Sequence, residues 1–530
     1  MSPVGVCGLL LLLLAAVNAA ANAKTYYVDV DSSGRASWAT SLAALGTVQP
    51  AAVVDYHRTF LVTGWTELNI TTNSTRSDMD QAYAAGYGEG IATYEDTVNS
   101  YSNSFSGFNY TIAPKLELYL TRNWAWMQSQ VAANNQTSDL WYQVGLLMRQ
   151  LEGLYDGLNA VAQHNQTFTW LMVHGLNLGG DLLDLFPAFG LTAVSEPLHR
   201  QHWTHCSALI KLKYDLSDIF FGHATWSTYN MMLRTYKHYH FKFSRAVTQE
   251  ISFSGYPGVL VSVDDFYLTD QGMAIIETTL NVDNASMYVG NIVPESLLYW
   301  VRVTVVTRVT SNAKDWVTEF SRYNSGTYNN QWMVLDLKLF TPGKDLLPNT
   351  LWIAEQFPGV VGIQDVTEIL QYGYWPSYNI PSIPSLYVAS GNAASAAESW
   401  HMNDYQKCVR AQIFRRDQAN VVDLASYQHI LQYNDYKVDP ASANDPGYAI
   451  SARHDLRVWP KMAECFGAVD AKTSSYSMYL NGRTVEAYSG PTPQQPLFDF
   501  ATTNATLMCS PRAGLPTLWN FTWQSFKPLA

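Results

Sequence analysis

The chain has 530 residues, with 32 Lys and Arg against 44 Asp and Glu, which gives a formal net charge of −12. Hydrophobic residues make up 47% and charged residues only 14%, a composition that excludes a disordered chain. The acidic balance, without any cluster of Lys and Arg, also excludes a nucleic-acid-binding surface, because contacts to phosphate need a basic patch.

The N-terminal segment has the pattern of a secretory signal peptide. Residues 8–17 read GLLLLLLAAV, an apolar run too short to span the roughly 30 Å of a bilayer core. Ala21-Asn22-Ala23 then supplies the small residues of a signal-peptidase site. We therefore expect residues 1–23 to be removed and the mature chain, from Lys24, to have no transmembrane segment.

Sequons for N-glycosylation recur along the chain, which fits passage through the secretory pathway and a secreted or lysosomal protein. The eight candidate acceptors are Asn69, Asn73, Asn109, Asn135, Asn165, Asn284, Asn504 and Asn520.

The first part of the mature chain is expected to hold short strands followed by long helices. Residues 24–65 form short runs typical of strands. From Asp78 to Trp170 the apolar residues follow helical spacing, with Ser77 as the cap of the first helix. Proline and glycine then appear in residues 183–204, which predicts an exposed loop ending at Cys206.

From Cys206 the pattern changes to strands. Residues 206–213 alternate, residues 214–218 form a turn, and residues 219–226 return as a second strand. A hairpin with its turn near Leu216 places Cys206 opposite the stretch from His223 to Trp226. Further strands are predicted in 257–270, 272–281 and 331–340, and helices in 294–323.

The histidines before Cys206 raise the question of a metal site. His199, His202 and His205 lie three apart, and on a helix they could ligate zinc together with Cys206. Because the segment follows Pro197 and has little helical support, we expect an exposed loop and no metal.

Two interpretations of Cys206 remain open on the pattern alone. A free cysteine is usually a small buried core residue. Alternatively, cleavage at His205–Cys206 would free an α-amino group, with a pKa of about 8, that could take the thiol proton. The chain has no G-x-S-x-G motif, so a serine lipase of the α/β-hydrolase type is not expected.

Several segments resemble the phospholipase B-like family, in the family's order: HCSALIKL, GHATWSTYNMMLR, YNSGTYNNQWMVLD, YWPSYNIP, RAQIFRRD and CFGAVDAK. The resemblance runs from about residue 84 to the C-terminus. It implies an α+β fold, the four-layered αββα sandwich of N-terminal-nucleophile hydrolases, and autocatalytic cleavage before a cysteine. Cys206 would then be the nucleophile, and the fragments 24–205 and 206–530 would stay associated.

The resemblance also implies the roles of residues around the nucleophile. His223 and Trp226, in GHATW, match site residues on the second strand, and the hairpin argument independently brings them near Cys206. Thr279, in IETTLN, matches a hydroxyl on the substrate side, with Thr278 as the neighbouring alternative.

Two further site residues follow from the same resemblance. Asn379, in WPSYN, matches an amide that stabilises an oxyanion, and Arg410, which opens RAQIFRRD, matches a site arginine. Asn324 and Asn330 are rival candidates for the oxyanion donor. The chain departs from the family pattern in its C-terminal tail, which lacks an expected histidine, and in its histidine-rich loop before Cys206.

The cysteines of the mature chain could pair in three ways. With Cys206 as the nucleophile that the resemblance implies, we favour a disulfide between Cys465 and Cys509, because it would hold the C-terminal tail to the body. Cys408 would then be a buried free thiol.

Three functions are compatible with these features. The first is hydrolysis of acyl esters of glycerophospholipids, as the family name implies. The second is hydrolysis of N-acyl or peptide-like amides, and the third is a binding glycoprotein whose cleavage is only maturation. No cofactor is expected for any of them.

Overall fold

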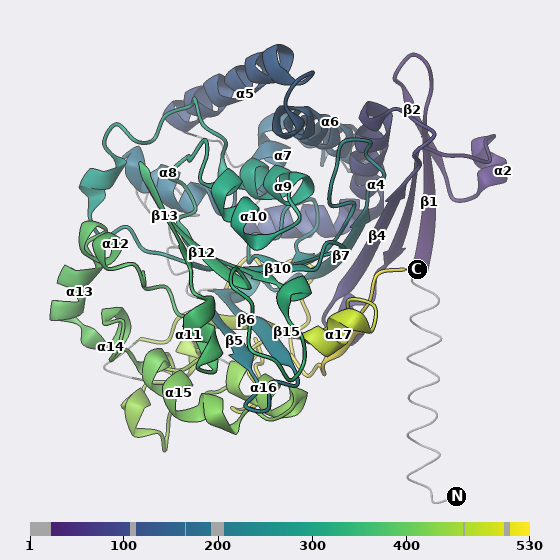
Figure 1. Ribbon diagram of the computed structural model, residues 1–530. Helices are drawn as coiled ribbons and strands as arrows, with labels where there is room; N and C mark the ends of the chain where they lie inside the picture. The colour runs from purple at the N-terminus through teal and green to yellow at the C-terminus, as the bar shows by residue number, and fades with distance from the viewer. Residues whose placement is uncertain are drawn as a thin grey trace, which may run out of the picture.

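The computed structural model describes residues 23–105, 113–164, 166–191, 206–458, 462–502 and 509–529. Over these residues helices and strands form four layers: helices, a large sheet, a smaller sheet and further helices (Figure 1). Each interface between layers holds its own hydrophobic core. The fold is therefore α+β, as expected.

The large sheet has 11 strands and combines segments from both sides of Cys206. All neighbouring strands pair antiparallel except β4 and β7, which run parallel and join the N-terminal strands to the rest. In spatial order the strands are β13 (Val360–Asp365), β12 (Leu351–Phe357), β11 (Asn330–Asp336), β10 (Met273–Thr279), β9 (Phe266–Thr269), β8 (Glu250–Gly255), β7 (Thr235–His240), β4 (Thr66–Thr72), β3 (Ala52–His57), β1 (Ala23–Val30) and β2 (Ala36–Ala39).

The smaller sheet carries the predicted hairpin. Its strand order is β14 (Tyr374–Ser377), β5 (Ser207–Leu212), β6 (Ile219–Thr228), β15 (Phe466–Ser475), β16 (Val485–Ser489) and β17 (Gln524–Phe526). Ala208 pairs with His223, and Leu216 in the turn adopts a φ of 56°. The predicted hairpin and its register are confirmed.

Helices cover the outer face of the large sheet (Figure 1). Among them α4 and α6 pack most closely: a Cβ on Gly153 would lie 2.1 Å from the carbonyl oxygen of Tyr83, so only glycine fits there. The Ser77 hydroxyl accepts from the backbone of Asp80 at 3.1 Å, as a cap should. These helices are α4 (Asp78–Phe105), α5 (Pro114–Asn134), α6 (Asp139–Ala160), α7 (Trp170–Asn177), α8 (Leu182–Ala188), α9 (Tyr299–Val309) and α10 (Ala313–Phe320).

The second helical layer packs on the smaller sheet through α15 and α16. Apolar side chains of these helices meet Leu209 and Phe220, which point away from the large sheet. Of the remaining helices of the C-terminal half, α12 packs against the large sheet, where Leu386 meets Phe357 of β12, and α17 follows β15 of the smaller sheet. The helices are α11 (Thr367–Gln371), α12 (Pro384–Ala389), α13 (Asn392–Glu398), α14 (Trp400–Asn403), α15 (Val409–Asp417), α16 (Leu424–Leu431) and α17 (Tyr476–Leu480).

Some local predictions were wrong. Two short helices, α2 (Leu42–Leu45) and α3 (Phe60–Thr63), interrupt the expected strands, each ended by a glycine in the left-handed conformation. Helix α8 occupies the start of the expected loop 183–204. Residues 257–265 form no strand, since β9 begins only at Phe266.

The predicted disulfide is confirmed. Cys465 and Cys509 are bonded, with their Cα atoms 5.4 Å apart, so the C-terminal tail is held beside the start of β15. Cys206 and Cys408 are free and buried.

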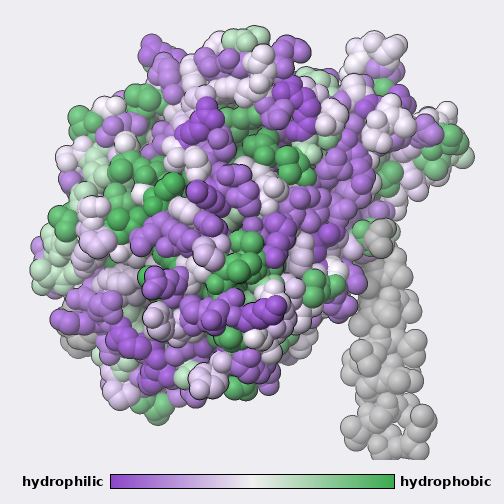
Figure 2. Space-filling model, viewed as in Figure 1, coloured by the Kyte–Doolittle hydropathy of each residue, from purple (hydrophilic) through white to green (hydrophobic). Residues whose placement is uncertain are grey.

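The surface and the helices of the described residues bear on the expectation that the mature chain has no transmembrane segment. Figure 2 shows hydrophilic side chains interspersed with separate hydrophobic groups on the face seen there. Among the described residues, no helix combines the length and apolar character needed to cross a bilayer.

The glycan acceptors differ in their accessibility. Asn69 is only 4% exposed and lies inside β4 between β3 and β7, which speaks against a glycan there in the folded chain. Others are at least partly accessible: Asn73, Asn135, Asn284 and Asn520. Three lie outside the described residues, as do His205 and the signal peptide up to residue 22: Asn109, Asn165 and Asn504.

Candidate active site

Cys206 immediately precedes β5, and its side chain shares a face with Ala208, toward the large sheet. The residue is 2% exposed. Burial, followed by the carboxyl of Glu277, raises the pKa of its thiol well above the ordinary value. The sulfur is therefore a protonated thiol unless a neighbouring group takes its proton.

Arg410 holds the backbone at the cysteine. Its guanidinium donates to the carbonyl oxygen of Cys206 at 2.7 Å and to Oδ1 of Asn379 at 2.8 Å. It also stacks over the ring of Trp226, 4.8 Å from the ring centroid. Burial lowers the pKa of Arg410 to about 10. The arginine thus connects three of the residues named by sequence to one another.

Asn379 bridges the two sheets at the same point. It has a left-handed φ of 69°, and its amide donates to the carbonyl oxygen of Thr279 at 2.6 Å. Among the described residues, the buried hydroxyl of Thr279 has no hydrogen-bond partner, whereas Thr278 contacts Ser377 at 2.6 Å. Of the two threonines, Thr279 therefore has the hydroxyl left free for a substrate.

A buried network of charges adjoins His223. The ammonium group of Lys472 donates to the hydroxyl of Thr225 at 2.5 Å and to Asp264 at 2.9 Å. Asp264 also pairs with Arg234. Burial raises the pKa of Asp264, but Arg234 and Lys472 outweigh this effect and hold the pKa well below its ordinary range, so Asp264 is an anion.

This network determines the proton position on His223. The Thr225 hydroxyl donates to anionic Asp264 at 3.0 Å and lies 3.3 Å from Nδ1 of His223. Since its one hydrogen goes to the carboxylate, the hydroxyl oxygen accepts from Nδ1–H. Burial, together with Lys472, lowers the pKa of His223 well below its ordinary value, so the ring is neutral and Nε2 carries a lone pair. Nε2 has no hydrogen-bond partner among the described residues.

Glu277 of β10 completes the cluster, and sequence reasoning missed it. The Cys206 sulfur, a ring nitrogen of His223 and a carboxyl oxygen of Glu277 all lie within 4.8 Å of one another. Burial, followed by Asp265, raises the pKa of Glu277 well above its ordinary value. The only sequence signal was its place two residues before Thr279.

The contacts of Glu277 agree with a protonated carboxyl. The Tyr328 hydroxyl lies 3.2 Å from Oε1 of Glu277 and also contacts the carbonyl oxygen of Val263. One hydroxyl hydrogen cannot serve both acceptors, so a proton on Glu277 satisfies the second contact. Cys206, His223 and Glu277 are the kinds of residue that bind metals, and a cation there would have to displace the protons of the thiol and the carboxyl.

An apolar pocket of about 50 Å³ is linked to this centre through Tyr328, and none of the residues that line it belongs to the cluster around Cys206. Its wall includes Val263, whose carbonyl oxygen contacts Tyr328, and Tyr256, whose ring lies under the guanidinium of Arg234. Both predicted fragments contribute to it: Phe105, Leu182 and Phe186 come from before Cys206, and Met231, Tyr256 and Val259 from after it. At this volume the pocket has room for a few water-sized groups and not for a whole acyl chain.

The structure brings most of the sequence-predicted site residues into one connected group, whereas the rival oxyanion donor Asn324 lies elsewhere. The members of the group are Cys206, His223, Trp226, Thr279, Asn379 and Arg410.

The two rival amides differ in their surroundings. Asn324 is used elsewhere, donating to the carbonyl oxygen of Phe357 at 2.9 Å and accepting from Gly326 at 2.9 Å. Asn330 pairs with Thr279 across β10 and β11, so it lies closer to the centre.

Comparison with known protein families gives a match over most of the chain. The family described as Phospholipase B matches residues 52–526. Phospholipase B-like protein D of Dictyostelium discoideum is 39% identical over 510 residues, covering 91% of this chain and 88% of that protein. Phospholipase B-like 1 of Homo sapiens is 36% identical over 505 residues, covering 91% of this chain and 90% of that protein.

Among solved structures, penicillin V acylase from Agrobacterium tumefaciens matches with a TM-score of 0.28 at 10% identity. The match covers 54% of this chain and 83% of the acylase. A likeness at this level carries no argument about the site.

Proposed function

The chain belongs to the phospholipase B-like family, and on this premise we propose that it is an N-terminal-nucleophile hydrolase that removes acyl chains from glycerophospholipids through Cys206. One observation carries the proposal. The free thiol of Cys206 stands at the head of β5 beside a neutral imidazole, and Arg410 holds the backbone carbonyl oxygen of the same residue. The order of the four layers agrees with the fold that the resemblance implies.

Maturation requires a base other than the α-amine, because in the intact chain that nitrogen belongs to the peptide bond. We assign this role to the lone pair of His223. The sulfur of Cys206 attacks the carbonyl carbon of His205, and the thiol proton passes to the imidazole. The carbon–nitrogen bond then breaks as the leaving nitrogen takes a proton from Glu277 or from the imidazolium. Water hydrolyses the resulting thioester, which restores the thiol and leaves a carboxylate on His205.

In the mature enzyme the freed α-amine of Cys206 takes over as base. Arg410 lies within hydrogen-bond reach of the same residue, and its positive charge favours the neutral amine by like-charge repulsion. The thiolate attacks the acyl carbonyl of the substrate, and the amide of Asn379 donates to the oxyanion. Trp226 and Thr279 contact the substrate, and water releases the acyl group.

The substrate class rests on the family. The matching relatives carry the name phospholipase B-like, which favours an acyl ester of a glycerophospholipid. An amidase for N-acyl or peptide-like amides is the second candidate, because a thiol nucleophile and an oxyanion donor suit both bonds. A binding protein without catalysis is disfavoured by the connected arrangement of Cys206, His223, Asn379 and Arg410.

We also propose passage through the secretory pathway, to the outside or to lysosomes. The disulfide between Cys465 and Cys509 is typical of oxidising compartments. Glycans are proposed at the accessible acceptors Asn73, Asn135 and Asn284, and at Asn520 near the C-terminus. The two fragments should remain associated after cleavage, because β4 and β7 pair within one sheet.

The proposal is tested with purified, cleaved protein on a panel of glycerophospholipids and N-acyl amides. We expect fatty acid release from a phospholipid by the unmodified protein and none by Cys206→Ala. Release from amides alone would favour the second candidate. A fully cleaved protein that hydrolyses no member of either class would contradict the hydrolase proposal.

A further inference from the structure

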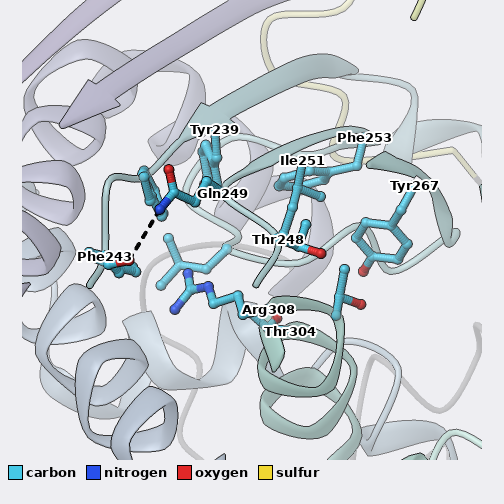
Figure 3. Close-up of a pocket in the computed structure, with 12 residues that line it drawn as sticks. Tyr239, Phe243, Thr248, Gln249, Ile251, Phe253, Tyr267, Thr304 and Arg308 are labelled. Atoms are coloured by element: carbon cyan, nitrogen blue, oxygen red, sulfur yellow. Dashed lines mark hydrogen bonds between the residues drawn. The ribbon is translucent and has the colours of Figure 1, made fainter. Parts of the chain in front are cut away.

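A small cavity lies away from the cysteine, between the large sheet and the helices that cover it. It has a volume of about 20 Å³, room for one or two water molecules. Strands β7 and β8 and their connection supply aromatic side chains, and helix α9 supplies Thr304 and Arg308 (Figure 3). The residues that line it include no Asp or Glu.

Arg308 extends from α9 toward Phe243 and Gln249 (Figure 3). It is 2% exposed, and its Nη2 donates to Oε1 of Gln150 at 2.8 Å. Its Nη1 has no acceptor among the described residues, and neither has the buried Nε2 of Gln150. The ion pairs found over the described residues do not include Arg308, and burial lowers its pKa to about 10.

An unpaired guanidinium in the protein interior is unfavourable, because the buried charge loses its hydration and gains no opposing charge. The guanidinium lies 5.4 Å from the ring centroid of Phe241 and 5.3 Å from that of Phe243. These contacts offset part of the desolvation but supply no negative charge. Two buried donors thus remain without acceptors among the described residues: one on Arg308, which lines the cavity, and one on Gln150, which lies beside Arg308.

We infer that Arg308 and Gln150 form a binding site for a small monovalent anion such as chloride. One positive charge calls for one negative charge, and the cavity has no room for a tetrahedral oxyanion with its hydration. The aromatic side chains around it can present ring edges, which carry partial positive charge. Arg308 belongs to the fragment after Cys206 and Gln150 to the fragment before it, so the ion would strengthen their association.

The first test compares thermal unfolding in sodium chloride and in sodium gluconate at equal ionic strength. We expect the midpoint of the unmodified protein to be about 1–3 °C higher in chloride and to saturate with concentration. Arg308→Met should remove this difference. Arg322→Met, on a side chain that is 53% exposed, should keep it and serves as the matched control.

Equal midpoints for the unmodified protein in the two salts would overturn the inference, as would a chloride effect that persists in Arg308→Met. A second measurement does not depend on that variant folding. Crystals of the unmodified protein soaked in bromide should show an anomalous peak within about 3.5 Å of the Arg308 guanidinium. A cavity without such a peak, in crystals that bind bromide elsewhere, would also overturn it.

Discussion

Replacing Thr225 by valine should slow autocatalytic cleavage without changing the shape of the side chain. The hydroxyl of Thr225 accepts from Lys472 at 2.5 Å, donates to Asp264 at 3.0 Å and lies 3.3 Å from Nδ1 of His223. Valine keeps the branched side chain but removes all three contacts. The Nδ1–H of His223 then loses its acceptor, and the ring is free to adopt the other tautomer, which places no lone pair on Nε2.

The magnitude follows from the loss of one buried hydrogen-bond partner. A buried donor left unsatisfied costs about 1–3 kcal/mol. If this cost adds to the activation barrier of cleavage, the cleavage rate falls by roughly 5-fold to 150-fold. Thr225→Ser retains the hydroxyl and should cleave within about threefold of the unmodified protein.

The assay follows conversion of the purified precursor into two fragments on denaturing gels. Circular dichroism and the unfolding midpoint of each variant report whether it has folded. A folded Thr225→Val variant that cleaves at the unmodified rate would refute the role of this hydroxyl. So would a Thr225→Ser variant as slow as the valine variant, since the effect would then not depend on the hydroxyl.

The remaining predictions concern turnover, the disulfide and pH. Asn379→Ala should lower kcat about 10²–10³-fold in mature protein; an unchanged kcat on the best substrate would make Asn330 the candidate donor. Cys509→Ser should lower the free energy of unfolding by about 3–4 kcal/mol, measured by denaturant titration, and a midpoint equal to the parent's would contradict this. Burial raises the pKa of Asp181 to about 7, so its stabilising effect is lost as pH rises from its ordinary pKa of 3.8 toward 7, whereas burial lowers the pKa of His238 to about 3, so the fold becomes less stable as pH falls from 6.5 toward 3. Between about pH 4 and 6.5 the two effects oppose each other, so we expect the unfolding midpoint to change little there and to fall as pH rises from about 6.5 to 7; a steady rise toward pH 8 would refute this.

The hairpin around Cys206 could be predicted because its information is local. Alternation fixes the face of each residue, and a short turn fixes the register, so His223 had to lie near the cysteine. With Cys206 as the nucleophile three cysteines of the mature chain remained, and the pair Cys465–Cys509 was favoured because it holds the C-terminal tail to the body. The prediction that Asn379 and Arg410 belong to the site depended on the family resemblance, because no local sequence pattern marks these residues.

The groups that set protonation could not be predicted. Lys472 contacts Thr225 from 247 residues away along the chain, and Glu277 meets Cys206 across the two sheets. In the sequence both residues belong to strand-like runs, where a charged side chain is usually read as facing solvent. Only the stacking of the two sheets shows that both are buried and paired. Similarly, α2 and α3 are single helical turns, too short for periodicity to detect.

The central claim is that the chain cleaves itself before Cys206 and uses the freed residue as nucleophile. N-terminal sequencing of the larger fragment from purified protein tests this most directly. We expect a sequence beginning CSALIKL in the unmodified protein and a single uncleaved chain in Cys206→Ala. A larger fragment that begins elsewhere, or a Cys206→Ala protein cleaved at the same bond, would contradict it.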